Sequence, residues 1–372
     1  MKSFKTELKL NNHQKTLMAK HAGVARHAYN WGLQACIETY QKGEKHPSAI
    51  DLHKRLVAEV KSQNPWYYEV SKCAPQQALR DLDRAFKNFF NIPSRGYPKF
   101  KKKGRKDSFY LEGNLKICGN KIKLPVMGWV KTYEKHLPPI LVNKSGGNVR
   151  ISFKGGRWFI AYKIDVQPPI IESKNSCVGV DLGVKTLATL SDGQTFPAVK
   201  PYRKAQKKLA FLQREVSRKV PGSANRKKAV KRLSKEHYRV ACIRKDAINK
   251  LTTYLAKNHS EIVIEDLNIS GMLKNHRLAS AIADGGFYEF RRQLEYKCEW
   301  YGSKLIVVDR FYPSSKTCSH CGFIHNELKL KERVFNCPNC GFSVDRDLNA
   351  AINLSKAGSF SVSACGVSNQ TF

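Results

Sequence analysis

The spacing of hydrophobic and polar positions changes several times along this chain, and each change predicts a different kind of element. The opening segment FKTELKL alternates apolar and polar residues, which is typical of a strand. From there to about residue 92, apolar residues recur at helical spacing, as in HAGVARHAYNWGLQACIETY and APQQALRDLDRAFKNFF. We therefore expect a short strand followed by an α-helical domain.

Short alternating runs then replace the helical spacing up to about residue 166. Two of them, NVRISF and RWFIAYKID, are joined by Lys154, Gly155 and Gly156, which predicts a β-hairpin in a small β domain. Between the helical and β regions lies Arg95–Tyr110, which mixes glycine, proline, a basic run and aromatic residues. This segment is expected either to link the two regions or to contact a nucleic-acid backbone.

Strands that alternate with helices begin near residue 177. CVGVDLGVKTLATLSDG predicts a strand, a turn and a second strand, and EIVIEDL and KLIVVDR predict two more, separated by the helix in GGFYEFRRQLEYKCEWYG. Before EIVIEDL, a basic stretch with helical spacing runs from about residue 200 to 257 and is broken near residues 220–223. Its apolar residues fall roughly on two faces, one with Leu209, Leu212 and Val216, the other with Val230, Leu233 and Val240. The pattern predicts an α/β domain with a central, partly parallel sheet.

The composition of the chain indicates which class of molecule the protein binds. A chain of 372 residues with 41% hydrophobic residues is expected to form two or three globular domains. Lysine and arginine number 66 against 30 acidic residues, and the net charge of +36 favours nucleic acid over a membrane surface as the partner. The first residues lack a signal-peptide pattern and no apolar run is long enough to cross a bilayer, so we expect a soluble intracellular protein.

Four of the eleven cysteines form a metal-binding pattern. Cys318, Cys321, Cys337 and Cys340 have the spacing C-x2-C-x15-C-x2-C, and a glycine follows each pair. This spacing predicts a closed, structural zinc site, and the glycines allow the tight turn that directs both thiolates to one ion. The other seven are expected to be small core residues or unreactive thiols: Cys36, Cys73, Cys118, Cys177, Cys242, Cys298 and Cys365.

Three carboxylates stand at the ends of elements that must be buried. Asp181 ends the strand VGVD, Glu265 ends IVIE, and Asp347 opens the helix DLNAAINLSKAG. Together they predict a Mg²⁺ or Mn²⁺ site for phosphodiester hydrolysis, in which two ions about 4 Å apart activate water and stabilise the leaving oxygen. Taken singly, each acid could instead cap a helix. Asp266, Asp309 and Asp345 are expected to have structural or supporting roles.

On the basis of these residues, the chain resembles the TnpB family. Its members are RNA-guided nucleases that bacterial and archaeal insertion sequences encode, and these nucleases are related to type V CRISPR effectors. The resemblance rests on VGVDLGVKTLATLS, VIEDLNISGMLKN, FRRQLEYKCEWYG, DRFYPSSKTCSHCG and CPNCGFSVDRDLNAAINL. It implies an RNase H-like (RuvC) nuclease domain whose catalytic, magnesium-binding acids are Asp181, Glu265 and Asp347. It also implies that the zinc-binding insert contacts the target nucleic acid.

The same resemblance implies a domain plan and partners. The expected parts are a first wedge strand (1–10), a helical recognition domain (11–105), a β wedge domain (106–172), the nuclease domain (173–313 and 343–357), the zinc insert (314–342) and a flexible tail (358–372). The expected partners are a guide RNA and double-stranded target DNA, with one protein chain for each guide and no membrane. Base pairing would read the target, while the protein would recognise a short adjacent motif. Such a protein would work in the prokaryotic cytoplasm.

Two other interpretations remain open from the residues alone. The nuclease fold could be a silent scaffold for an RNA-guided or zinc-dependent DNA-binding protein or repressor. RNase H-like acids also serve transposases that join strands themselves.

Overall fold

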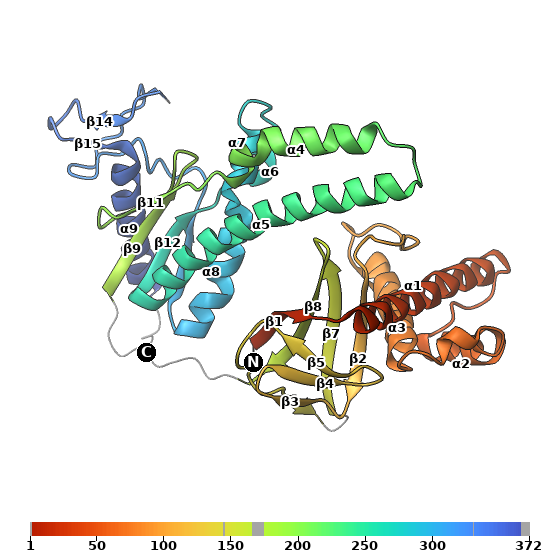
Figure 1. Cartoon of the computed structure of the whole chain (residues 1–372). Helices are drawn as coiled ribbons and strands as arrows, with labels where there is room; N and C mark the ends of the chain where they lie inside the picture. Colours follow the sequence, from red (N-terminus) through yellow and green to blue (C-terminus); the bar gives the residue numbers. More distant parts are fainter. Residues whose placement is uncertain (1, 144–145, 166–174, 330, 366–372) are drawn as a thin grey trace, which may run out of the picture. The chain divides into compact units, whose positions relative to one another are not determined.

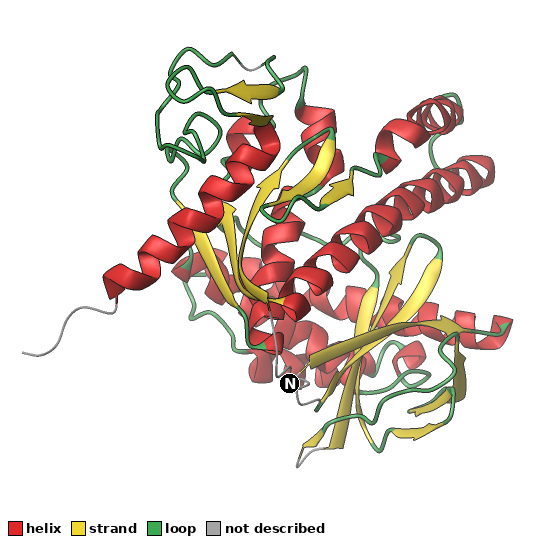
Figure 2. Ribbon diagram, turned by 90° about the vertical axis from the view of Figure 1, so that its left-hand side faces the viewer, coloured by secondary structure: helices red, strands yellow, loops and turns green. Residues whose placement is uncertain are grey.

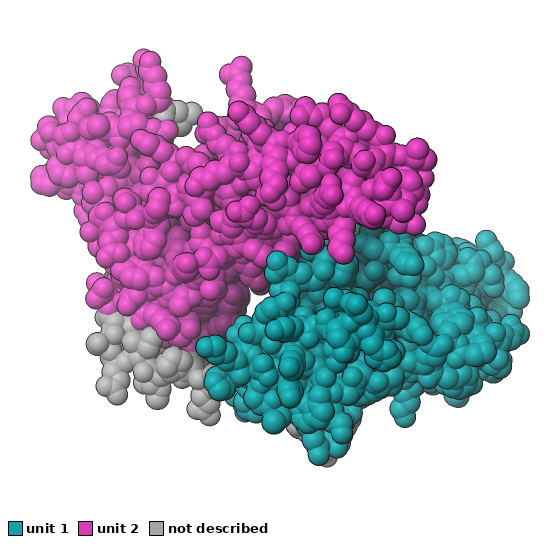
Figure 3. Space-filling view, in the orientation of Figure 1, with its two compact units in different colours: residues 1–167 teal, residues 168–372 magenta. Residues whose placement is uncertain are grey.

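A computed structural model describes residues 2–143, 146–165, 175–329 and 331–365. The chain separates into two compact units, Met1–Gln167 and Pro168–Phe372, which are coloured separately in Figure 3. Each unit has its own hydrophobic core. Within the described residues, none of the helices is long and apolar enough to span a membrane.

An antiparallel sheet forms the β part of the first unit. Its strands follow the order β2-β7-β8-β1-β5-β4-β3, and β6 pairs with β7. The strands are β1 (Lys2–Lys9), β2 (Ser108–Gly113), β3 (Lys116–Cys118), β4 (Lys121–Leu124), β5 (Gly128–Thr132), β6 (Val142–Asn143), β7 (Gly146–Lys154) and β8 (Arg157–Ile164). The N-terminal strand β1 pairs with both β8 and β5, so the first residues of the chain complete a sheet formed mainly by residues after 107.

The hairpin between β7 and β8 has the turn that its sequence predicts. Lys154 pairs with Arg157 across the turn, and the two residues between them are Gly155 and Gly156. Both glycines have positive φ, +59° and +81°, which a type I′ turn requires and which a side chain would disfavour. The Gly-Gly pair therefore fixes the register of these two strands.

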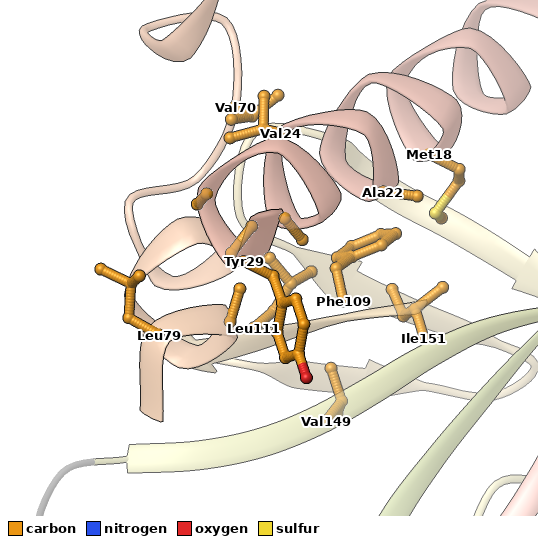
Figure 4. Packing of buried hydrophobic residues seen from close by; sticks show 14 of the residues in the cluster. Met18, Ala22, Val24, Tyr29, Val70, Leu79, Phe109, Leu111, Val149 and Ile151 are labelled. Carbon is orange, nitrogen blue, oxygen red and sulfur yellow. The ribbon is translucent and has the colours of Figure 1, made fainter. Parts of the chain in front are cut away.

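Helices of the first unit pack on one face of this sheet. They are α1 (Asn12–Gln41), α2 (Ala49–Arg55), a π-helical segment η1 (Leu56–Lys61), a short 3₁₀ helix η2 (Pro65–Tyr67) and α3 (Cys73–Asn91). Asn11 and Gln14 form a reciprocal capping box that begins α1. Figure 4 shows Met18, Ala22 and Tyr29 of α1 above Phe109 and Leu111 of β2 and Val149 and Ile151 of β7. The helical and β regions thus share one core.

The basic segment Arg95–Tyr110 is irregular up to residue 107, and β2 begins at Ser108. Part of it is fixed to α1. The Lys101 N–H donates to Asn30 at 2.8 Å, the Asn30 amide donates back to the Lys101 carbonyl at 3.0 Å, and the Lys101 ammonium lies 3.6 Å from the Tyr29 ring centroid. Both the backbone and the side chain of Lys101 therefore contact α1.

The second unit is built on a five-stranded mixed sheet in the order β11-β10-β9-β12-β13. Its strands are β9 (Asn175–Leu182), β10 (Thr186–Leu190), β11 (Thr195–Pro197), β12 (His259–Glu265) and β13 (Lys304–Val308). Strands β9, β12 and β13 are mutually parallel, and β10 is antiparallel to β9 and β11. This is the partly parallel sheet that the hydrophobic pattern predicts and the RNase H-like arrangement that the family resemblance implies.

Helices cover both faces of that sheet, as Figure 2 shows. On one face α5 (Ala224–Asn258) and α8 (Phe287–Tyr301) enclose a core with Val178 and Val180 of β9 and Ile262 and Ile264 of β12. On the other face lies α9 (Arg346–Cys365), which contacts β9, β12 and β13. Short helices α6 (Ile269–Met272) and α7 (Ala279–Gly285) connect β12 to α8. Helix α9 extends beyond residue 357, where the sequence predicts its end.

The basic stretch after β11 forms a long hairpin of α4 (Pro201–Ser217) and α5, which lie side by side in Figure 1. Leu209, Leu212 and Val216 are buried, as predicted. The prediction for α5 was wrong at Val230, which is 46% exposed, because its neighbour Ala229 occupies the buried position. Glu236, two turns after Ala229, and Val240, one turn after Glu236, continue the buried face, and Glu236 pairs with Lys208 of α4 at 2.7 Å.

Two of the cysteines outside the paired pattern agree with the prediction of core residues. Cys36 and Cys298 are buried, and burial raises the pKa of Cys36 to about 11. Cys118 and Cys242 are exposed. The side chain of Cys365 lies outside the described residues.

Candidate catalytic and metal sites

Strand register places the first two carboxylates beside each other. Val180 of β9 pairs with Ile264 of β12, so the residues that follow them, Asp181 and Glu265, stand at the same level of the sheet. Val180 and Ile264 point into the core below α5 and α8, and alternation turns the two acids to the opposite face, where α9 lies. The two parallel strands thus place both acids at the same edge and on the same face of the sheet.

Helix α9 brings the third acid to the same place. It crosses β9 so closely that a Cβ added to Gly179 would lie 1.9 Å from the Ala351 carbonyl oxygen. Further back along the strand, the Cys177 thiol donates to the Ser355 carbonyl at 3.5 Å. The helix therefore runs against the direction of β9, and Asp347, one turn before Ala351, projects beside Asp181, two residues after Gly179.

The pKa values of two of the acids shift in the direction expected for neighbouring carboxylates. Burial, and then the negative charges of Asp347 and Glu265, raise the pKa of Asp181 to about 7. Burial, followed by the charge of Asp266, also raises the pKa of Glu265. Hard carboxylate oxygens gathered in this way are the donor set that Mg²⁺ and Mn²⁺ prefer, and a cation between them would relieve the repulsion.

The three acids are less tightly grouped than the cysteines. Among the described residues, the ligand atoms of Cys318, Cys321, Cys337 and Cys340 form the one cluster that meets the spacing of a single-ion site, all within 4.8 Å of one another. The carboxylates do not meet that spacing, so their case as ligands rests on shared placement and electrostatics.

Neighbouring aspartates have structural partners instead. Asp345 accepts hydrogen bonds from the backbone N–H groups of Asp347 and Leu348 at 3.0 and 3.1 Å and so caps α9. Asp266 pairs with both Arg291 and Arg310, and hydrogen bonds from these two arginines lower its pKa. Asp309 accepts a hydrogen bond from the N–H of Phe311 at 2.8 Å. Each therefore supports the local backbone or a nearby arginine.

The cysteine cluster has the dimensions of a zinc site. Four sulfurs each about 2.3 Å from a tetrahedral zinc ion stand about 3.8 Å from one another. The measured distances are 3.8 Å between Cys318 and Cys340 and 3.6 Å between Cys321 and Cys337. Gly322 and Gly341 have positive φ, +78° and +71°, as the predicted turns require. Two short strands, β14 (Val334–Asn336) and β15 (Ser343–Asp345), complete the insert, which therefore fits zinc.

Two asparagines that the sequence analysis missed attach this insert to α9. Asn349 accepts from the Ser319 N–H at 2.9 Å and donates to the Thr317 carbonyl at 2.7 Å. Asn353, one turn later, donates to the carbonyls of Ser314 and Thr317 at 2.8 and 2.6 Å. Both side chains are buried. Two asparagines four residues apart in the otherwise apolar stretch LNAAINL were the available signal, because asparagine is unfavourable there without such partners.

An RNase H-like sheet with three neighbouring acids and an insert with four cysteines spaced to hold one metal ion defines the class of the second unit as a RuvC-type nuclease fold. Sequence comparisons then give the family. Residues 159–276 match the OrfB_IS605 family, described as "Probable transposase", and residues 287–354 match "Cas12f1-like, TNB domain". Residues 1–45 match "Helix-turn-helix domain", although here they form β1 and the single helix α1.

Full-length relatives support the same assignment. A candidate RNA-guided DNA endonuclease of Streptomyces pristinaespiralis is 35% identical over 98% of this chain and 91% of its own length. InsQ of Escherichia coli K12, given the same description, is 36% identical over 98% of this chain and 94% of its own. A partial match is the CRISPR-associated endodeoxyribonuclease Cas12f1 of Sulfoacidibacillus thermotolerans, which is 25% identical over 53% of this chain and 50% of its own length. The chain belongs to the TnpB family.

Solved structures are more distant. The Cas12f1 chain of a complex with sgRNA and target DNA aligns over 96% of this chain and 99% of that one, with 17% identity and a TM-score of 0.37. CasPhi-2 bound to crRNA aligns over 96% and 97%, with 11% identity and a TM-score of 0.42. Similarities this low support no inference about this chain.

Proposed function

We propose that this protein is an RNA-guided DNA endonuclease of a transposable element. It would bind a transposon-derived guide RNA, recognise a short motif beside a double-stranded target in the prokaryotic cytoplasm and hydrolyse DNA phosphodiester bonds. The observation that carries the proposal is the convergence of Asp181, Glu265 and Asp347 at one edge of an RNase H-like sheet. Relatives described as RNA-guided DNA endonucleases, matched over nearly their whole length, support the guided form of that activity.

In this proposal the three carboxylates are the catalytic residues and hold Mg²⁺ or Mn²⁺. The divalent ions supply activation of water and stabilisation of charge on the leaving oxygen. The chain holds its acids on rigid elements: β9 and β12 position Asp181 and Glu265, and the contact of α9 with Gly179 positions Asp347. The four cysteines hold a structural zinc ion, and Asn349 and Asn353 attach that insert to the helix carrying Asp347.

The remaining parts of the chain are assigned to nucleic-acid binding. The helices and sheet of the first unit serve as recognition and wedge domains, and the zinc insert contacts the target. A guide–target heteroduplex is a long polyanion, and a chain with a net charge of +36 can neutralise many of its phosphates. The protein supplies charge and shape, while base pairing selects the sequence.

The test is coexpression of the protein with its native flanking DNA, followed by sequencing of the RNA that copurifies. We expect a discrete RNA with a constant structured part and a variable 3′ segment, and cleavage of DNA that matches this segment. Asp181→Ala should abolish cleavage and leave RNA binding intact. Asp246→Ala is the matched control, because Asp246 is exposed on α5 and pairs only with Lys250 among the described residues.

Three results would contradict the proposal. Random cellular RNA would count against guidance. Target binding without cleavage under any divalent ion would indicate a repressor. Strand-transfer products would indicate a transposase that joins DNA itself.

A further inference from the structure

A cavity of about 320 Å³ lies in the second unit, apart from the three carboxylates. Its floor is apolar and includes Val184, Leu187 and Ile248, of which Leu187 and Ile248 belong to the core below α5. Val184 lies in the turn that follows β9, just beyond Asp181. The cavity therefore lies on the α5 side of the sheet, opposite to α9, and Val184 places part of its lining three residues after Asp181.

Positive charge surrounds this apolar floor. Lys200, Arg203, Arg244 and Arg277 all line the cavity, and Asp284 is the one acid among the lining residues. Asp284 already has partners. It accepts hydrogen bonds from the backbone N–H groups of Tyr202 and Arg203, and it forms an ion pair with Arg244 at 3.2 Å. Its side chain is only 4% exposed, so this acid serves as the cap of α4 and the anchor of Arg244.

The other three cations have no acidic partner. Across the described parts of the chain, no carboxylate lies within ion-pair distance of Lys200, Arg203 or Arg277. Three cations without partners around a hollow create a positive potential that attracts an anion. Tyr202 also lines the cavity and offers an aromatic surface beside them.

From this combination we propose that the cavity binds one nucleotide, with its base on the apolar floor and Tyr202 and its phosphate at Arg203 and Arg277. A cavity of about 300 Å³ or more is of the size that holds small organic ligands. Aromatic and apolar contacts accept any base, and arginine accepts phosphate through paired N–H groups. The nucleotide could be a residue of the bound strand, unstacked next to the cleavage site, or a free mononucleotide.

This inference extends the proposed function, but its first test does not need cleavage. Adenosine 5′-monophosphate is added to the full-length chain, and saturation transfer to the base protons is measured by NMR. We expect transfer in the wild type, its loss in Ala281→Trp, which fills the cavity, and affinity roughly tenfold weaker in Arg277→Gln. Ribose 5-phosphate, which lacks the base, should bind more weakly. Ala210→Trp and Arg218→Gln, both exposed and outside the cavity, should behave as the wild type.

A thermal-unfolding scan of each variant establishes that it is folded, and Arg277→Gln tests the same site without adding bulk. Absence of base-proton transfer in the wild type, or unchanged transfer in both cavity variants, would overturn the inference even if guided cleavage is found. Conversely, if the chain binds the nucleotide but never cuts DNA, the cavity would still be a nucleotide-binding site, and only the proposed nuclease activity would be contradicted.

A second arm identifies the source of the nucleotide. Single abasic positions are scanned through the cleaved strand, and the apparent KM is measured for the wild type and Ala281→Trp. If the cavity takes a nucleotide of the strand, one abasic position should raise the KM of the wild type several-fold and have little further effect in Ala281→Trp. If no position behaves in this way but adenosine 5′-monophosphate binds, the cavity holds a free nucleotide.

Discussion

The carbonyl oxygen of Ala351 lies directly over Gly179, at a spacing that leaves no room for a side chain on the strand. A Cβ at position 179 would stand 1.9 Å from that oxygen and 2.5 Å from the Ser355 nitrogen. Both obstacles are backbone atoms of α9, so no rotamer change can relieve the overlap. The distance between helix and strand, and with it the position of Asp347, depends on this glycine.

Gly179→Ala should therefore displace α9 and separate the acids. We expect a loss of roughly 1–3 kcal/mol or more in the free energy of unfolding, together with a large loss of cleavage. Thermal unfolding and cleavage rates measure the two effects. Gly96→Ala is the control, because a Cβ at Gly96 meets nothing within 4 Å and its change should be near zero. Full cleavage by Gly179→Ala would show that the acids do not depend on this packing.

Asn349→Ala should weaken the attachment of the zinc insert. The change leaves the Ser319 N–H and the Thr317 carbonyl without this buried partner, which costs roughly 1–3 kcal/mol. Faster release of zinc to a coloured chelator, with a lowered melting temperature, is the expected result. Asn91→Ala, at the exposed end of α3, serves for comparison. Equal zinc release from both variants would mean that the insert holds its metal independently of α9.

One zinc ion should be found for each chain by elemental analysis, and Cys337→Ser should lower that content strongly. Because α9 is joined to the insert, we also expect the zinc-depleted protein to lose cleavage that added magnesium alone does not restore. Reconstitution with zinc and magnesium together should restore it. Recovery of cleavage with magnesium alone would show that the catalytic carboxylates do not depend on the zinc-loaded insert.

The raised pKa of Asp181 predicts how stability depends on pH. A free aspartate has a pKa of about 3.9, whereas burial and then the charges of Asp347 and Glu265 raise the pKa of Asp181 to about 7. Between these values the folded state binds more protons than the unfolded chain, so this contribution to stability is complete below about pH 4 and is lost as the pH rises through about 7.

In buffer without added divalent ions, Asp181→Asn should therefore melt at a higher temperature than the wild type at pH 8, and the difference should shrink at pH 5. Magnesium should stabilise the wild type and leave the variant unchanged, because ligand binding to the folded state adds stability only where the site exists. Differential scanning calorimetry at the two pH values checks both points. A variant less stable than the wild type at pH 8 would contradict the assignment.

Local patterns predicted much of this fold. Gly155 and Gly156 predicted a turn that the structure contains, and the apolar runs at Val178–Val180 and Ile262–Ile264 predicted buried strands. The cysteine spacing predicted a cluster whose sulfur distances fit zinc. In each case the signal lies within a few residues, or in a spacing that chemistry restricts.

What the sequence could not supply depends on packing between distant segments. Val230 and Ala229 are both compatible with a helix face, and only the contact of α5 with α4 decides that Ala229 is buried. Asn349 has no visible partner until the insert folds back on α9. The cavity lined by Arg203 and Arg277 likewise exists only after four separate segments meet.

Helix α9 uses opposite sides for two attachments: Ala351 and Ser355 touch the sheet, while Asn349 and Asn353 bind the zinc insert. This arrangement sets the boundaries for building chimeras within the family. An exchange of residues 314–345 alone would join a foreign insert to asparagines that evolved with another backbone. An exchange that also carries α9 would keep those hydrogen bonds, but would then have to match Gly179 in the recipient sheet. Recombination between relatives should therefore be tolerated best when the whole second unit moves together.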